Sequence, residues 1–281
     1  MIVVTGATGN IGRTLVPLLA EAGEDVVAVS RRPESDGLPA GARRAQADIG
    51  NSASVRPVLD GADALFLLLG GELNGHGESP NALLEVALDA GVKRIVLLSS
   101  QINSTRPEAL SHTRLREFES AVRASGADFA ILRPGGFASN AFAWAESVRT
   151  KRTVFAPFGD VALPVVDPAD IAAVAAEALR GGGHTGRTYE LTGPEVISPR
   201  RQTAAISRAL GEEVTFVELS REEARVHMAQ FMPEEVIGGT LDILGVPRPA
   251  EQAVSPDVQN VLGRPANHFD EWVARNLPAF R

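Results

Sequence analysis

Three glycines near the N-terminus carry the strongest chemical signal in this sequence. Gly6, Gly9 and Gly12 are three residues apart, directly after the apolar run 2–4 and before a helical pattern. The first permits a tight turn, the second lets the backbone approach a pyrophosphate, and the third lets helix and strand pack closely. The alternative is an ordinary glycine-rich turn. We predict a dinucleotide site that includes Thr5, Gly6, Thr8, Gly9, Asn10, Ile11 and Gly12.

The residues after the second apolar run bear on which nucleotide binds. An NAD site usually has Asp or Glu at this point, on the ribose 2′-hydroxyl. Here Ser30 is followed by Arg31 and Arg32, whose guanidinium groups match a 2′-phosphate. The sequence therefore favours NADP(H) over NAD(H), although the two arginines could simply be solvated residues of a turn. Asp48 could border the adenine or form a turn of its own.

Composition narrows the classes of function. The chain has 281 residues, 44% of them hydrophobic, a net charge of −8 and no cysteine. The lack of cysteine excludes disulfides and cysteine ligands, and the negative net charge argues against nucleic acid as a partner. The five histidines have no metal-ligand spacing, and no apolar stretch approaches the roughly 20 residues of a membrane span. The N-terminus has no signal pattern, so we expect a cytoplasmic protein with a small-molecule substrate and no metal.

Apolar runs and helical patterns alternate along the first half of the chain, which predicts a parallel sheet covered on both faces. The predicted strands there are 2–4, 26–29, 45–47, 64–69, 95–98 and 129–132, and the predicted helices are 13–22, 52–59, 80–90 and 111–125. Further along, we predict strands at 161–166, 188–191 and 214–218, and helices at 170–179, 199–210, 222–231, 234–244 and 269–276.

These elements predict an α/β fold, with a Rossmann-type doubly wound parallel sheet and a smaller C-terminal α/β substrate-binding region. Residues 1–140 would form the NAD(P)-binding Rossmann domain, with parts of 160–195 returning to the sheet. Residues 141–281 would form the smaller substrate-binding or lid region. In open α/β sheets, ligands bind outside the carboxyl ends of the strands, so the residues that follow each strand are the site candidates.

Two of the predicted strands end in such candidates. Leu69 and Gly70 close one strand, and the glycine would let the cofactor approach the backbone. Ser99 and Ser100 close the next, with Gln101 after them, where a polar contact to nicotinamide or substrate is expected. The alternative for the serines is a hydrogen bond to the strand terminus.

The sequence resembles the NmrA-like branch of the extended and atypical short-chain dehydrogenase/reductase superfamily, which includes quinone reductases, isoflavone-reductase-like enzymes and redox-sensing regulators. The matching segments are 5–12, 98–100, 131–137, 166–172 and 188–194, with Asn140. The resemblance implies cofactor contacts for Arg133, Pro134, Gly135 and Phe137. Asn140 and Trp144 would border the substrate. Packing and helix capping are the alternatives for Phe137 and Asn140.

One departure from the superfamily pattern affects the expected chemistry. Typical members carry a Ser, then Tyr-x-x-x-Lys about thirteen residues later. The single tyrosine of this chain, Tyr189, lacks the lysine, and the same spacing from Ser99 leads to His112 and Arg116. An imidazole can exchange a proton near neutral pH, whereas arginine keeps its charge. Alternatively, His112 is an incidental residue behind a Ser111 cap, and Arg116 pairs with Glu119 on the helix surface.

Two functions from different classes follow. The favoured one is an NADPH-dependent oxidoreductase that transfers hydride to a small apolar carbonyl, quinone or activated double bond, without the usual Tyr-x-x-x-Lys pair. His112, or a water held by Ser99 and Ser100, would protonate the product oxygen. The alternative is a non-catalytic NADP(H)-binding redox sensor that acts through a protein partner. Epimerase chemistry ranks last, because it depends on the missing tyrosine.

Overall fold

The chain forms two compact units in a computed structural model that describes residues 1–32, 38–69, 77–230 and 232–281. Unit 1 comprises residues 1–134, 168–191 and 260–263. Unit 2 comprises residues 135–167, 192–259 and 264–281. The two units are described separately below.

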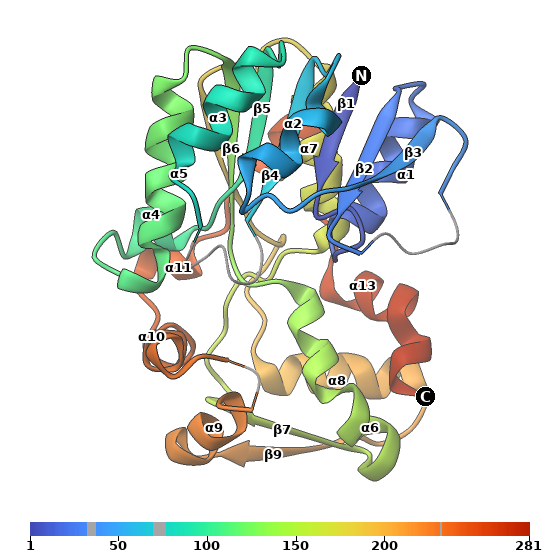
Figure 1. The fold of residues 1–281 in the computed structure, drawn as a ribbon. Helices are drawn as coiled ribbons and strands as arrows, with labels where there is room; N and C mark the ends of the chain where they lie inside the picture. The colour runs from blue at the N-terminus through green and yellow to red at the C-terminus, as the bar shows by residue number, and fades with distance from the viewer. Residues whose placement is uncertain (33–37, 70–76, 231) are drawn as a thin grey trace. The chain divides into compact units, whose positions relative to one another are not determined.

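Unit 1 is built on a seven-stranded sheet with the strand order β3-β2-β1-β4-β5-β6-β8 (Figure 1). All neighbouring strands pair in parallel. The strand order reverses at β1, so the crevice between β1 and β4 is the expected ligand position of a doubly wound sheet. The strands are β1 (Ile2–Thr5), β2 (Val26–Ser30), β3 (Ala42–Gln46), β4 (Ala64–Leu68), β5 (Arg94–Leu98), β6 (Asp128–Pro134) and β8 (Arg187–Leu191).

Helices flank this sheet in two groups. One group, α1 (Gly12–Glu21) and α7 (Pro168–Arg180), packs together and contacts β1 to β6. The other consists of α2 (Ser52–Leu59), α3 (Pro80–Asp89) and α5 (Thr113–Ala124), whose apolar side chains share a core with every second residue of the strands. Because strand side chains alternate between faces, the remaining strand residues face the first group. A short helix, α4 (Ile102–Thr105), follows β5.

Unit 2 contains a two-stranded parallel sheet, β7 (Thr153–Pro157) with β9 (Thr215–Leu219). Its largest core cluster gathers apolar side chains around Trp272, including Val154, Ile206 and Phe280. Its helical elements are η3 (Ala138–Trp144), α6 (Ala145–Lys151), α8 (Pro199–Leu210), α9 (Arg221–Met228), α10 (Glu234–Gly245), α11 (Pro249–Gln252), α13 (Phe269–Asn276) and η4 (Leu277–Phe280). Helix α12 (Asp257–Leu262) continues into a segment of unit 1.

The predicted α/β class and doubly wound parallel sheet are confirmed. The strand predicted at 161–166 is wrong. Leu163 and Val166 make only isolated bridges, and Pro164 between them cannot donate to a ladder. The strand predicted at 45–47 lies earlier, at β3. The helix predicted from residue 111 begins at Thr113, after the turn η2 (Leu110–His112).

None of the helices in the described ranges is both long and apolar enough to cross a membrane. No group of three or more His, Asp or Glu side chains in those ranges could hold a metal ion.

Candidate functional site

The turn after β1 is anchored to the neighbouring strand by Thr5. Its buried hydroxyl donates a hydrogen bond to the carbonyl of Phe66 and accepts one from the N–H of Leu68, both at 2.9 Å. Gly6 then adopts a φ of +65°, and a Cβ at this position would lie 3.2 Å from the Leu68 side chain. The Thr5 side chain therefore fixes where the turn begins and has little capacity left for a ligand.

Gly12 lies where no side chain fits. A Cβ there would lie 2.3 Å from the carbonyl oxygen of Gly6 and 2.5 Å from the Cα of Ala7, well inside van der Waals contact. Gly9 closes the turn from the middle, because its N–H donates to the carbonyl of Gly6 at 2.9 Å. The turn is therefore folded tightly against the start of α1, as the predicted role of the third glycine requires.

The start of α1 offers backbone donors. Ile11 is the N-cap residue, and its side chain makes no capping hydrogen bond. Within the described chain, the N–H groups of Ile11 and Gly12 form no hydrogen bond, while Gly9 and Asn10 are exposed on the turn. The Thr8 carbonyl accepts from Nε of Arg13 at 2.8 Å. Free N–H groups and the positive end of a helix dipole are the features that bind a pyrophosphate, so these residues fit a dinucleotide.

Two exposed arginines follow the end of β2. Ser30 is the last residue of the strand, and its carbonyl accepts from the N–H of Ala47 at 3.3 Å. Arg31 and Arg32 follow and are exposed, and neither guanidinium group forms a hydrogen bond or ion pair with the rest of the described chain. The carbonyl of Arg31 is held by Nε2 of Gln46 at 3.0 Å. The Arg31 carbonyl is thus held, while no described residue occupies either guanidinium group, so each can match an anion.

Asp48 forms a local turn. Its Oδ1 accepts from the N–H of Gly50 at 2.9 Å, and its own N–H donates to Oγ of Ser54 at 2.9 Å. The carbonyl of Asp48 also accepts from the N–H of Asn51. These bonds fit the turn role that the sequence left open for this residue.

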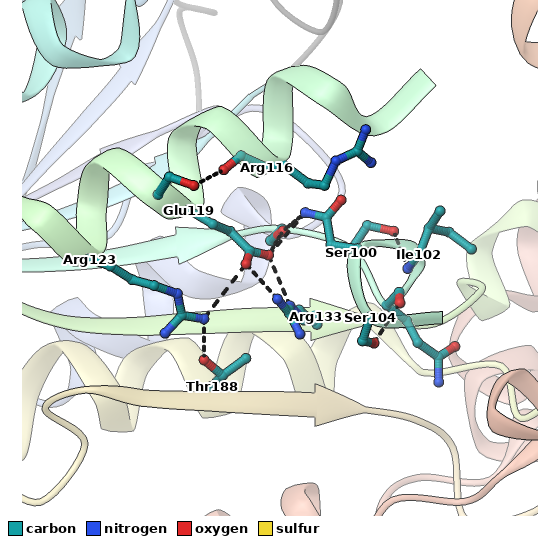
Figure 2. Close-up of polar contacts among 12 residues, drawn as sticks. Ser100, Ile102, Ser104, Arg116, Glu119, Arg123, Arg133 and Thr188 are labelled. Carbon is teal, nitrogen blue, oxygen red and sulfur yellow. Dashed lines mark hydrogen bonds and ion pairs between the residues drawn. The ribbon is translucent and has the colours of Figure 1, made fainter. Parts of the chain in front are cut away.

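A buried polar network lies behind the end of β5 (Figure 2). The Ser99 hydroxyl donates to Oε1 of Glu119 at 2.6 Å and accepts from Nδ2 of Asn103 at 2.9 Å. Asn103 also donates to Oε1 of Glu119 at 3.0 Å. All three side chains are buried. Because the one proton of Ser99 is directed at the carboxylate, Ser99 can offer a ligand only a lone pair.

Arg133 pairs with Glu119 through both edges of its guanidinium group. Nε donates to Oε1 at 2.9 Å, and Nη2 donates to Oε2 at 2.6 Å. Nη1 faces Oε1 of Glu190 at 3.5 Å, and Ser104 donates to the same oxygen at 2.9 Å. The side chain predicted to contact the cofactor is therefore largely engaged by the two carboxylates.

The two carboxylates of this network titrate differently. Burial alone would raise the pKa of Glu119, but hydrogen bonds from Arg133, Asn103 and Ser99 more than offset it, so the pKa is lowered. Burial raises the pKa of Glu190, and the hydrogen bond from Ser104 and the charge of Arg133 do not fully compensate. Glu119 is therefore a fixed anion at neutral pH.

Ser100 differs from Ser99 in the direction of its hydrogen bonds. Its Oγ accepts from the N–H of Ile102 at 3.2 Å, and its own proton goes to no other described residue (Figure 2). The side chain is half-buried. Gln101, the third candidate here, is buried, and its N–H donates to the carbonyl of Pro134 at 3.0 Å. Of the two serine hydroxyls at the end of β5, Ser100 is thus the one whose proton no described residue accepts.

His112 is the N-cap residue of α5 and makes no side-chain cap. Its Nδ1 lies 3.0 Å from Oγ of Ser111. Burial and the charge of Arg116 lower the pKa of the imidazole, which is therefore neutral at pH 7. The alternative in which Ser111 caps the helix is wrong, because Ser111 belongs to the preceding turn.

Arg116 does not pair with Glu119, contrary to the alternative that the sequence offered. Its Nη2 donates to Oγ1 of Thr113 at 2.9 Å, while Glu119 is taken by Arg133. Nη1 is buried and has no hydrogen-bond partner among the described residues.

The other candidates lie in unit 2 or at the end of β4. Leu69 is buried beyond β4, and Gly70 lies outside the described residues. Gly135 and Phe137 lead into η3, where Phe137 bridges the backbone of Val166. Asn140 is exposed, and Trp144 packs partly against the core of unit 2.

The sequence did not single out Glu119 or its partner Asn103 as site residues. Glu119 lies on the same helical stripe as Leu115, Phe118 and Val122, and that stripe faces the core. A carboxylate on an apolar stripe needs a buried partner, and this was the signal that could have found it.

Residues 6–181 match the model of an NAD(P)H-binding family. The chain is 39% identical to a (4-alkanoyl-5-oxo-2,5-dihydrofuran-3-yl)methyl phosphate reductase of Streptomyces griseus, covering 100% of this chain and 99% of the relative. It is 32% identical to an NAD(P)H azoreductase of Xenophilus azovorans, with the same coverage of each.

A solved structure agrees with these sequence relatives. The fold is similar to that of an NADPH-dependent quinone oxidoreductase of Escherichia coli in complex with NADPH, with a TM-score of 0.80 and 25% identity over 99% of this chain and 100% of that one. The chain therefore belongs to the NAD(P)H-binding family. Within it, the relatives place the protein among the NAD(P)H-dependent oxidoreductases.

Proposed function

We propose that this protein is an NADPH-dependent reductase of a small apolar carbonyl, quinone or activated double bond. The observation that carries the proposal is the turn at Gly6–Gly12, which fits a pyrophosphate. Two exposed arginines that pair with no described residue follow at the end of β2. The named relatives act on a phosphorylated furanone, azo compounds and quinones. Each of these substrates contains an unsaturated acceptor group, which supports the substrate class.

Different residues of unit 1 would bind different parts of the cofactor. The N–H groups at the start of α1 would bind the pyrophosphate, and Arg31 with Arg32 would bind the 2′-phosphate. When bound, the reduced nicotinamide supplies the hydride. Ser99, with its proton directed at Glu119, presents a lone pair to a donor of the ligand.

The substrate oxygen needs a hydrogen-bond donor, because reduction places negative charge on it. Ser100 fits this role, since its proton is not used by another described residue. His112 is the second candidate. Its lowered pKa makes it a weak source of protons at pH 7, although the neutral ring can still donate one N–H.

Replacing Arg31 and Arg32 together with alanine is expected to lower kcat/KM for NADPH about 10- to 100-fold and to change kcat/KM for NADH little. The reason is that each charge-assisted hydrogen bond to a phosphate contributes about 1.5–3 kcal/mol. Steady-state rates with both cofactors measure the ratio. Arg56→Ala is the matched control, because it removes an exposed arginine from α2. An unchanged NADPH preference in the double variant would refute this assignment.

Ser100→Ala is expected to lower kcat at least tenfold with little change in KM or thermal stability, because it removes a donor that acts as charge develops. Ser99→Ala is expected to act mainly on stability, since it takes one buried donor from Glu119. Kinetics and thermal melts of the two variants separate these roles. If kcat is normal in Ser100→Ala but falls strongly in a stably folded Ser99→Ala, the roles assigned to the two serines would be reversed.

The experiment that tests the function is NADPH consumption by the purified protein with a panel of quinones, enones, azo dyes and aldehydes. NADH is run in parallel. Turnover with NADPH well above that with NADH is the expected result. Tight NADPH binding without turnover of any class would favour the sensor instead.

A further inference from the structure

Helix α5 carries three arginines, and they differ in their partners. Arg114 pairs with Glu117 at 3.2 Å and also donates to the carbonyl of Glu78. Arg123 donates to Thr188 at 2.8 Å and lies 3.7 Å from Glu119. Arg116, by contrast, has no carboxylate partner among the described residues. Its guanidinium group makes one hydrogen bond to the described residues, to Thr113, and Nη1 is buried with no partner among them (Figure 2 shows the side chain pointing away from Glu119).

An unpaired guanidinium group in a partly buried position is costly, because it has lost water without gaining a partner. The groups around it do not compensate. The first turn of α5 contains no acidic residue, and His112 beside it is neutral. Among the described residues, Oγ1 of Thr113 accepts a hydrogen bond from the guanidinium group, and Oγ of Ser111 bonds Nδ1 of His112. Within the described ranges, the cluster of Arg116, His112 and Thr113 therefore carries the positive charge of Arg116 and no carboxylate pairs with it.

We propose that Arg116, together with Thr113 and His112, binds the phosphate of a phosphomonoester substrate. This inference rests on the proposed reductase function and adds a phosphate group to the otherwise apolar acceptor proposed there. A guanidinium fork matches a phosphate in geometry and charge. Only one neutral hydrogen bond, to Thr113, must break for the side chain to turn Nη1 toward a ligand.

Two sources could supply the phosphate, namely the substrate or the dinucleotide. The start of α1 and the pair Arg31–Arg32 already match the phosphates of the dinucleotide, and Arg116 lies on a different element, after β5. The relative that is 39% identical over the full chain is itself named as the reductase of a phosphate ester. Both points favour the substrate.

The first test is kinetic. A hydroxymethyl enone and its phosphate ester are compared as substrates with saturating NADPH. The wild type is expected to favour the phosphate ester in kcat/KM by about 10- to 100-fold, and Arg116→Gln is expected to lose most of that ratio. Arg187→Gln, which removes an exposed arginine from β8, is the control and keeps the ratio. A ratio that is unchanged in Arg116→Gln would overturn the proposal.

The second test needs no turnover. The NMR titration of the His112 ring is followed with and without inorganic phosphate. A bound dianion favours the charged imidazole, so phosphate is expected to raise the pKa of His112 in the wild type and not in Arg116→Gln. An unchanged titration in the wild type would overturn the phosphate site even if the reductase activity stands. If Arg116→Gln instead loses its NADPH-over-NADH preference in binding, the phosphate belongs to the cofactor, and the substrate assignment is overturned.

Discussion

Gly12→Ala is expected to weaken NADPH binding by at least about 100-fold. The added Cβ would lie 2.3 Å from the Gly6 carbonyl oxygen and 2.5 Å from the Cα of Ala7, so backbone must move. The groups that would move are the turn and the start of α1, which would bind the pyrophosphate. Isothermal titration calorimetry of the protein with NADPH measures the change in affinity.

Two further variants keep this prediction testable if Gly12→Ala folds poorly. Gly9→Ala places its Cβ 3.1 Å from the Gly6 carbonyl oxygen and meets no other atom within 4 Å, so a smaller loss of affinity is expected. Gly182→Ala meets no atom within 4 Å and should bind NADPH like the wild type. If folded Gly12→Ala binds NADPH within a few-fold of the wild-type affinity, the turn and the start of α1 are not the pyrophosphate site.

Glu119→Ala is expected to lower the free energy of unfolding by about 3–5 kcal/mol, the cost of leaving a buried charge without its partner. Arg133 would lose both of its bonds to Glu119 and keep only the longer contact with Glu190. Denaturant unfolding measures the change. Glu117→Ala, at an exposed position on the same helix, should cost far less. Equal losses in the two variants would show that the network does not stabilise unit 1.

The same carboxylate makes stability depend on pH. The pKa of Glu119 is lower in the folded state than in the unfolded chain, whose glutamates titrate near pH 4.3. Its contribution is therefore present above that pH and is lost as the pH falls through the folded value. Glu119→Gln should show a flatter fall in unfolding free energy below about pH 4.3 than the wild type. Parallel curves would contradict this reading.

The sequence predicted unit 1 well because its signals are local. Strands β1, β2, β4 and β5 contain continuous apolar runs, and a glycine turn joins the first strand to the first helix. Helix α2 was predicted at its observed bounds, and its N-cap Asn51 accepts from the N–H of Ser54. Where the apolar periodicity, the helix-cap residues and the turn residues all indicate the same elements, the sequence strongly favours one fold.

Unit 2 was predicted less well, because its elements depend on tertiary contacts. Strand β7 was missed. It follows Arg152, which adopts a left-handed conformation that its residue type does not announce. The apolar run 161–166 looked like a strand but contains Pro164, which interrupts the ladder.

The candidate site shows the same division between local and tertiary signals. The glycine turn could be predicted from the residue spacing, but the hydrogen-bond partners of the two serine hydroxyls could not. Ser99 and Ser100 are identical in sequence terms, and only the position of Glu119 directs the proton of Ser99 inward. Likewise, Glu119 pairs with Arg133 and not with Arg116 because β6 packs against α5.

The measurement that tests the account most directly is a single turnover of the protein with stoichiometric NADPH. The bound NADPH is mixed with a quinone, and the loss of nicotinamide fluorescence is followed in the wild type and in Gly12→Ala. We expect rapid oxidation of NADPH by the wild type and none above the uncatalysed rate in Gly12→Ala. Tight binding of NADPH by the wild type, without oxidation by any quinone, enone or azo acceptor, would contradict the assignment as a reductase.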